Sequence, residues 1–192
     1  MITEKSLRKF AELLVYVVGN FHNNTLAETK LWKLLYFCEA DFFEKNQRTI
    51  TGVDYYKNKY GATPDKKVID RILSKINKKY ITIEEIKKSD GRKIKIFKPV
   101  EGVNFKYNAL SADEIAGAQK TCQQYYNLPV NNIIVLAHED PPYLGAKPKE
   151  KIDFNFVNYR ETESEILEKE TEGCYKGTIS DEAAEKLLAY VG

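Results

Sequence analysis

Several features that would assign a chemistry are scarce in this chain of 192 residues. It has three cysteines (Cys38, Cys122 and Cys174) and two histidines (His22 and His138), and none is spaced like the ligands of a zinc site. Three widely separated cysteines also argue against a disulfide framework. The ten glycines are scattered, without a phosphate-binding loop or a Gly-x-Ser-x-Gly motif. We therefore expect no metal, no cofactor and no enzymatic activity.

Long apolar runs are also absent. No stretch approaches the roughly 18 consecutive apolar residues of a membrane-spanning helix. The first ten residues, MITEKSLRKF, lack the apolar stretch and small-residue cleavage site of a secretory signal. Together with the cysteine usage, this predicts a cytoplasmic protein without a membrane partner. A hydrophobic content of 43% is enough for the core of one domain of ordinary size.

The overall charge is small but strongly segregated along the chain. The formal net charge is +2, yet residues 57–98 carry a net charge of +9 and residues 99–192 a net charge of −7. A basic middle and an acidic C-terminal part could attract each other or bind two different partners. The simpler alternative is that these charges lie on solvated surfaces of a helix and a hairpin.

The most apolar stretch is KLWKLLYFCEADFF, which begins at Lys30 and lies within a helix expected over residues 27–46. Apolar side chains occupy nearly every side of this helix, a pattern typical of a helix buried in the centre of a fold. Cys38 lies among them, and we interpret it as a core thiol rather than a nucleophile.

Two carboxylates interrupt this apolar helix. Glu39 and Asp41 are two residues apart and so point to divergent sides, which makes a paired acid and base implausible. A buried carboxylate without a partner is costly to keep ionised. We expect Glu39 at the edge of the helix. We expect Asp41 to be partly buried and bound to a backbone N–H of the Thr51-Gly52 turn, or to a nearby lysine or tyrosine hydroxyl.

Apolar residues at helical spacing predict about five further helices around the central one. Thr63 and Pro64 resemble an N-cap and a first helical residue, and Ser111 with Glu114 forms a capping box. The additional helices are expected over residues 6–21 and 65–78, from Ser111, from Pro129, and from Ser180 to the C-terminus.

A small antiparallel sheet completes the expected fold, which is α+β and mainly α-helical. It consists of a strand near residues 53–60 and a hairpin over residues 80–98, turning at Asp90-Gly91. A three-residue loop sets Ile86 opposite Ile94 and Glu85 opposite Lys95. This register pairs apolar residues on one face and charged residues on the other. We expect one domain over residues 1–143. Residues 144–192 would form an extension packed on it, with an edge strand at 152–159, an acidic stretch and a terminal helix.

Residues 30–64 resemble the Panacea domain, found in SocA-like antitoxins and phage-associated proteins. The matching pattern is a Lys-Leu-Leu-Tyr helix followed by an acid, then an apolar-Thr-Gly turn, then an aromatic strand that ends at a glycine before a helix. Ala62 departs from the proline that many members have after this glycine, and His138 with Tyr143 only loosely resembles a later His-aromatic feature. The residues that carry the resemblance are Lys33, Leu34, Leu35, Tyr36, Phe37, Asp41, Ile50, Thr51, Gly52, Tyr55, Tyr56, Tyr60, Gly61 and Pro64.

The resemblance implies a non-catalytic protein that neutralises a cognate toxin by direct binding. Because Panacea domains are similar across antitoxins of unrelated toxins, it does not identify the toxin. The polar and aromatic residues of the motif are then candidates for a structural role or for toxin binding, and a homo-oligomer remains open. Binding needs buried area and a few aromatic anchors, and thirteen tyrosines could supply them or could simply cover the core.

The basic hairpin supports an alternative function. A helix followed by a cationic hairpin has the order of a recognition helix and a wing, which would suit a transcriptional or phage-associated regulator that binds nucleic acid, including its own promoter. The helix lacks a cluster of side chains suited to reading base edges. The candidate phosphate-binding residues are Lys87, Lys88, Arg92, Lys93 and Lys95.

Overall fold

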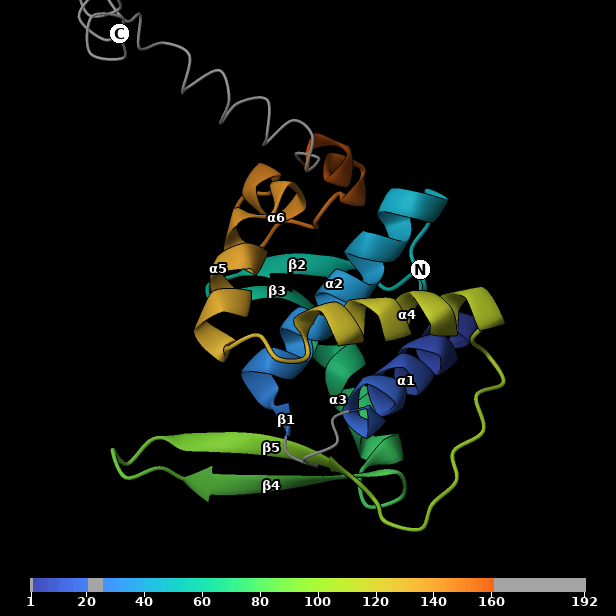
Figure 1. The fold of residues 1–192 in the computed structure, drawn as a ribbon, viewed down its shortest axis with the longest axis vertical. Helices are drawn as coiled ribbons and strands as arrows, with labels where there is room; N and C mark the ends of the chain where they lie inside the picture. The colour runs from blue at the N-terminus through green and yellow to red at the C-terminus, as the bar shows by residue number, and fades with distance from the viewer. Residues whose placement is uncertain (1, 21–25, 161–192) are drawn as a thin grey trace, which may run out of the picture. The chain divides into compact units, whose positions relative to one another are not determined.

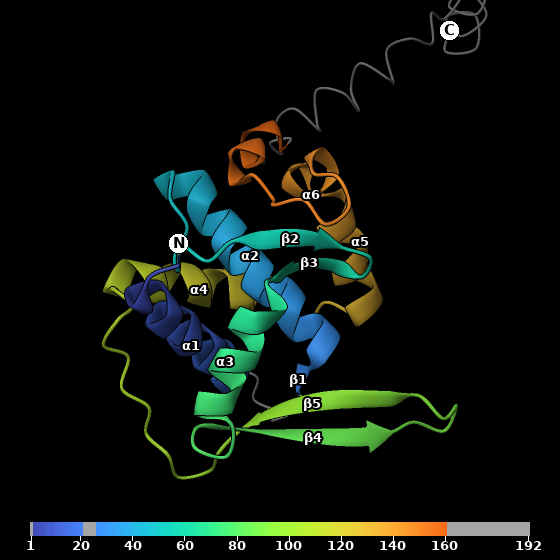
Figure 2. The same cartoon turned by 180° about the vertical axis from the view of Figure 1, so that it is seen from behind.

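Helix α2 (Glu28–Asn46) lies at the centre of the fold, as Figures 1 and 2 show. The computed structural model describes residues 2–20 and 26–160. Helices α1 (Glu4–Gly19), α4 (Ala112–Tyr125) and α5 (Val130–Glu139) all contact α2. Its side chains from Lys30 to Ala40 are buried without interruption. The sequence-predicted buried central helix is therefore confirmed, as is the mainly helical α+β class.

The basic hairpin has the predicted register. Strands β4 (Ile81–Lys87) and β5 (Lys93–Pro99) pair so that Ile86 lies opposite Ile94 and Glu85 opposite Lys95. The third strand of this sheet is the short β1 (Leu26–Ala27), which pairs with the far side of β5. The hairpin reaches away from the helices in both views (Figures 1 and 2).

The strand near residues 53–60 does not belong to that sheet. It is β2 (Tyr55–Asn58), and it pairs with β3 (Gly61–Pro64) in a separate sheet of two strands. The physical reason is the tight turn at Gly61, whose φ of +117° lies in a region that side chains rarely adopt. The chain reverses there and pairs back on itself before the next helix begins.

Pro64 is consequently the last residue of β3, and its predicted place in the first turn of a helix is wrong. Thr63 is paired with Tyr56, and its hydroxyl accepts a hydrogen bond from the amide of Asn58. Helix α3 (Lys66–Ile76) is capped instead by Asp65, whose side chain accepts from the backbone N–H of Lys67.

The chain after α5 packs on the same compact unit, which spans residues 1–158. Helix α6 (Pro141–Gly145) follows α5, and the backbone near Glu150 and Ile152 then bonds to that of β2. The edge strand predicted over residues 152–159 is wrong, because Phe154–Tyr159 form a 3-10 helix and the pairing falls just before it. The acidic stretch and the C-terminal helix lie outside the described residues. Within the described ranges, no helix is long and apolar enough to cross a membrane.

Helix α4 crosses α2 closely at Gly117. A Cβ atom placed on Gly117 would lie 2.7 Å from the buried ring of Phe42, well inside van der Waals contact. The capping box of Ser111 and Glu114 is present at the start of this helix. The missing side chain at Gly117 thus sets the distance between the two helices.

We predict that Gly117→Ala destabilises the protein by about 1–2 kcal/mol, because overpacking against Phe42 exceeds the roughly 1 kcal/mol that alanine gains in helix propensity. Urea unfolding measures the difference. Gly19→Ala, in α1, is the matched control, since a Cβ atom there meets nothing within 4 Å. Equal or greater stability of the Gly117→Ala variant would show that the helices separate without cost.

Candidate interaction site and the buried polar network

Four polar side chains occur at every third position along α2, and each is bonded to a different segment of the chain. The Nζ atom of Lys30 donates to the carbonyl oxygens of Tyr126 and Leu128, both at 2.8 Å, at the end of α4. The hydroxyl of Tyr36 donates to Asp140 at 2.6 Å, between α5 and α6. These three bonds connect the central helix to the second half of the domain.

Lys33 supplies the third connection. It is buried, and its Nζ atom donates to the carbonyl oxygen of Tyr60 in the β2–β3 turn. Burial lowers the pKa of Lys33 to about 8. A Cβ atom on Gly61 would lie 1.4 Å from this nitrogen. The lysine and the glycine of the family motif therefore depend on each other, because the ammonium group occupies the space that any side chain at position 61 would need.

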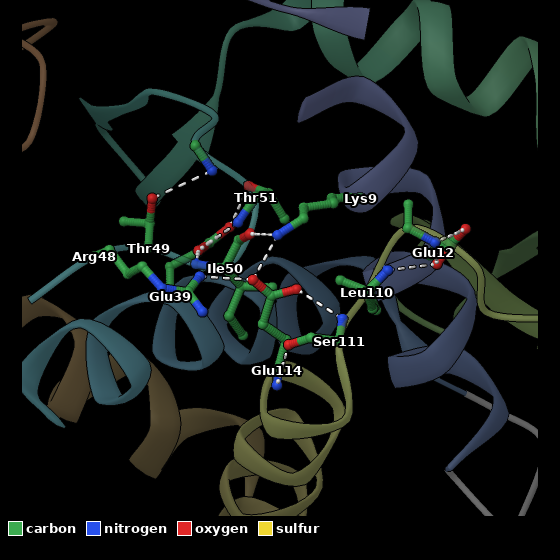
Figure 3. Close-up of polar contacts among 12 residues, drawn as sticks. Lys9, Glu12, Glu39, Arg48, Thr49, Ile50, Thr51, Leu110, Ser111 and Glu114 are labelled. Carbon is green, nitrogen blue, oxygen red and sulfur yellow. Dashed lines mark hydrogen bonds and ion pairs between the residues drawn. The ribbon is translucent and has the colours of Figure 1, made fainter. Parts of the chain in front are cut away.

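Glu39 supplies the fourth connection and holds the turn that follows α2 (Figure 3). Its carboxylate is fully buried and accepts from the backbone N–H groups of Ile50 (2.6 Å) and Thr51 (3.2 Å), and from the Thr51 hydroxyl. The prediction that Glu39 lies at the helix edge is wrong. Glu39 instead faces this turn and accepts the backbone hydrogen bonds that we expect for Asp41.

Asp41 is half-buried, as predicted, but its described partner is on another element. Its carboxylate accepts from the hydroxyl of Thr121 in α4 at 2.9 Å. Asp41 thus connects the central helix to α4, whereas the N–H groups of Thr51 and Gly52 bond to Glu39 and Thr49. Gly52 has a φ of +71°, so the turn needs glycine for its backbone conformation.

Burial raises the pKa of Glu39 to about 7, against the opposing effect of the three hydrogen bonds from Thr51 and Ile50; the charge of Glu114 raises it further. The folded protein therefore binds a proton at Glu39 more tightly than the unfolded chain. The stabilisation from this proton is complete below about pH 4.5 and is lost as the pH rises through 7.

Two further buried glutamates hold loops in the same way (Figure 3). Glu12 of α1 accepts from the backbone N–H groups of residues 108–110 at 2.9–3.1 Å. Glu114 accepts from Lys9 at 2.5 Å and from Arg48 at 2.6 Å. Burial alone would raise the pKa of Glu114, but the bonds from Lys9, Ser111 and Arg48 bring it below its usual value. Sequence patterns gave no sign of Glu12, whereas the capping box marked Glu114.

The remaining motif residues divide sharply by exposure. Tyr55 is buried, and its hydroxyl has no hydrogen-bond partner among the described residues. Tyr56 is half-buried and Pro64 is buried. Tyr60, at the tip of the β2–β3 turn, is 77% exposed. Of the motif residues proposed for toxin binding, Tyr60 is thus the large aromatic most exposed to a partner.

Around Tyr60, the α5–α6 segment adds an aromatic stack. The ring of His138 lies parallel to that of Tyr143, with centroids 4.9 Å apart, and the Tyr143 hydroxyl donates to the carbonyl of Asn58 in β2. Burial, followed by the positive charge of Lys33, lowers the pKa of His138. This lowered pKa disfavours the charged form of His138 at its place between α5 and the turn.

The cations of the hairpin are largely paired with acids. Lys93 bonds to Glu85 at 2.7 Å, and Arg92 bonds to Asp90 at 2.7 Å. Lys95 lies 3.6 Å from Glu28. Lys87 and Lys88 have no ion pair with any described residue. Pairing on the protein itself weakens the positive field that phosphate binding requires.

Comparison with protein families assigns the chain. The family model described as "Antitoxin SocA-like, Panacea domain" matches residues 31–143, more than half of the sequence. The chain belongs to this family. Comparisons with curated proteins and with solved structures gave no match. The matched range runs from within α2 to within α6, and so includes all the segments that the four polar residues of α2 hold in place. Among the described residues, no group of three potential metal ligands occurs.

We predict that Gly61→Ala destabilises the protein by about 2–4 kcal/mol, because the new methyl group meets Lys33 and the backbone is strained at positive φ. In a double-mutant cycle, Lys33→Ala should remove part of this cost, with a coupling of about 1 kcal/mol or more. Urea unfolding of the two single variants and the double variant measures it. Strictly additive effects of the two substitutions on the free energy of unfolding would contradict a contact between Lys33 and position 61.

We predict that Glu39 makes stability fall with rising pH. Between pH 5 and pH 8, the free energy of unfolding of the native protein should drop by about 2–3 kcal/mol more than that of Glu39→Gln, which cannot titrate. Urea unfolding of both proteins at the two pH values measures the difference. A native protein that gains stability from Glu39 as the pH rises would contradict the sign, since its folded pKa would then lie below 4.5.

Proposed function

We propose that this protein is the antitoxin of a toxin–antitoxin pair and neutralises its cognate toxin by direct, non-catalytic protein–protein binding. Membership of the SocA-like Panacea family is the observation that carries the proposal. A binding protein needs a surface held in one conformation, since ordering flexible segments on association costs affinity. The hydrogen bonds of four side chains of α2 provide such rigidity to the segments around it.

The polar groups of the core support this proposal. Glu12, Glu39 and Glu114 are buried, and their oxygens are occupied by backbone N–H groups, hydroxyls and cations of the protein itself. The ammonium group of Lys33 likewise donates a hydrogen bond to the carbonyl oxygen of Tyr60. Each of these groups stabilises a loop, which is the use expected of buried polar residues in a scaffold rather than in a reaction centre.

Binding to promoter DNA, the alternative function, has less support. Arg92, Lys93 and Lys95 each lie within ion-pair distance of an acid. In α3, Lys66 pairs with Asp70 at 2.9 Å and Arg71 with Glu4 at 3.0 Å. The surface of the presumed recognition helix thus carries anions beside its cations, which is unfavourable next to phosphates.

We predict that co-expression of this protein restores growth to cells that express the product of the neighbouring gene, provided that this product is toxic alone. The two proteins should co-purify as a complex, and Gly117→Ala should weaken protection only through lower stability. Growth measurements and size-exclusion chromatography report the two effects. Failure to protect or to form a complex would reject the proposal, and a salt-sensitive gel shift with promoter DNA would then favour the alternative.

A further inference from the structure

Large apolar side chains are exposed on three neighbouring elements at one side of the fold. Tyr60 in the β2–β3 turn is 77% exposed, Val135 on the outer side of α5 is 51% exposed, and Leu144 in α6 is 60% exposed. Helix α5 contacts both β3 and α6. We refer to these three residues as the apolar face. Single exposed apolar residues are ordinary, but several on adjoining elements commonly mark an interaction site.

The elements that carry the apolar face are fixed to one another by partly buried hydrogen bonds and a ring stack. Lys33 holds the carbonyl of Tyr60, and the Tyr143 hydroxyl holds the neighbouring carbonyl of Asn58. The stacking of His138 on Tyr143 joins α5 to α6. Because this side of the protein is already ordered, binding there would cost little conformational entropy.

Cations border the apolar face on the β2–β3 hairpin. The Nζ atom of Lys59 lies 5.6 Å from the centre of the Tyr60 ring, and that of Lys57 lies 4.6 Å from the centre of the Tyr143 ring. Strands β2 and β3 and their turn, residues 55–64, contain no acidic residue. On the α5–α6 segment, the acids are the exposed Glu139 and the buried Asp140. Asp140 is bonded to Tyr36.

We propose that the apolar face is the surface on which the toxin docks, and that the toxin presents an apolar patch bordered by carboxylates near Lys57 and Lys59. This inference rests on the proposed antitoxin function and adds the location and the chemistry of the contact. Tyr60 is the expected anchor, since tyrosine combines a large apolar ring with a polar end and is enriched among the dominant residues of interfaces. The lysines accelerate encounter with an acidic partner.

The test uses the toxic product of the neighbouring gene as the probe, with the full-length protein. Tyr60→Ala, Val135→Asp and Leu144→Asp should each weaken binding by about tenfold or more, as expected for residues at the centre of an interface. Val103→Asp is the matched control, because Val103 is 43% exposed in the loop between β5 and α4 and lies outside the apolar face. The control should stay within about twofold of the native protein, since residues outside an interface change affinity little.

Lys59→Glu tests the charge. It should lower the association rate and reduce the dependence of that rate on salt, with a smaller effect on dissociation. Thermal unfolding of every variant shows that the fold is retained, and Tyr60→Ala keeps the carbonyl that Lys33 requires. The substitutions could instead alter only self-association, measured by light scattering, or only binding to anionic vesicles. Either result would show that the apolar face is not the surface that binds the toxin.

The outcomes separate this inference from the proposed function. If the native protein neutralises the toxin and the triple variant Tyr60→Ala/Val135→Asp/Leu144→Asp binds it equally well, the docking surface is wrong while the antitoxin function stands. If the native protein neither binds nor neutralises the toxin, the proposed function fails and the docking surface fails with it. Loss of binding in the three variants, with the Val103→Asp control unaffected, supports both.

Discussion

The fold depends on satisfying the polar groups of a buried helix. An unpaired polar or charged group in a protein interior costs several kcal/mol, so α2 can be central only if its lysines, tyrosine and glutamate find partners. Lys30, Lys33, Tyr36 and Glu39 find them in the end of α4, the β2–β3 turn, the start of α6 and the turn after α2. The same bonds that make burial tolerable therefore position the segments that surround the helix.

This arrangement changes the meaning of the family motif. Lys33, Tyr36, Thr51 and Gly61 are mostly inaccessible, and they act on one another or on Glu39 and Asp140. Apart from the exposed Tyr60, these motif residues make internal bonds, so they specify a rigid domain and leave other surface residues free to differ. That division fits a domain shared by antitoxins of unrelated toxins, as the resemblance implies, because the shared part would supply rigidity and the exposed part would supply the contacts.

The sequence predicted those features that depend on local periodicity and left out those that depend on tertiary bonds. The buried α2, the capping box of α4 and the hairpin register follow from apolar spacing and turn residues. The predicted position of Glu39 and the predicted partner of Asp41 were wrong, whereas the partial burial and pairing of Asp41 were confirmed. Helical direction alone does not say which neighbouring segment each side faces. The sequence does carry a signal for these bonds, namely polar residues at every third position of an apolar helix. Each such residue requires a hydrogen-bond partner elsewhere in the chain.

Residue-resolved amide hydrogen exchange, comparing the native protein with Glu39→Gln, tests the central claim most directly. If Glu39 holds the turn, the amides of Ile50 and Thr51 exchange slowly in the native protein and much faster in the variant. The amides of residues 108–110, held by Glu12, serve as the internal control and should be unchanged. Equally slow exchange of Ile50 and Thr51 in both proteins would contradict the account, because the turn would then be ordered without the buried carboxylate.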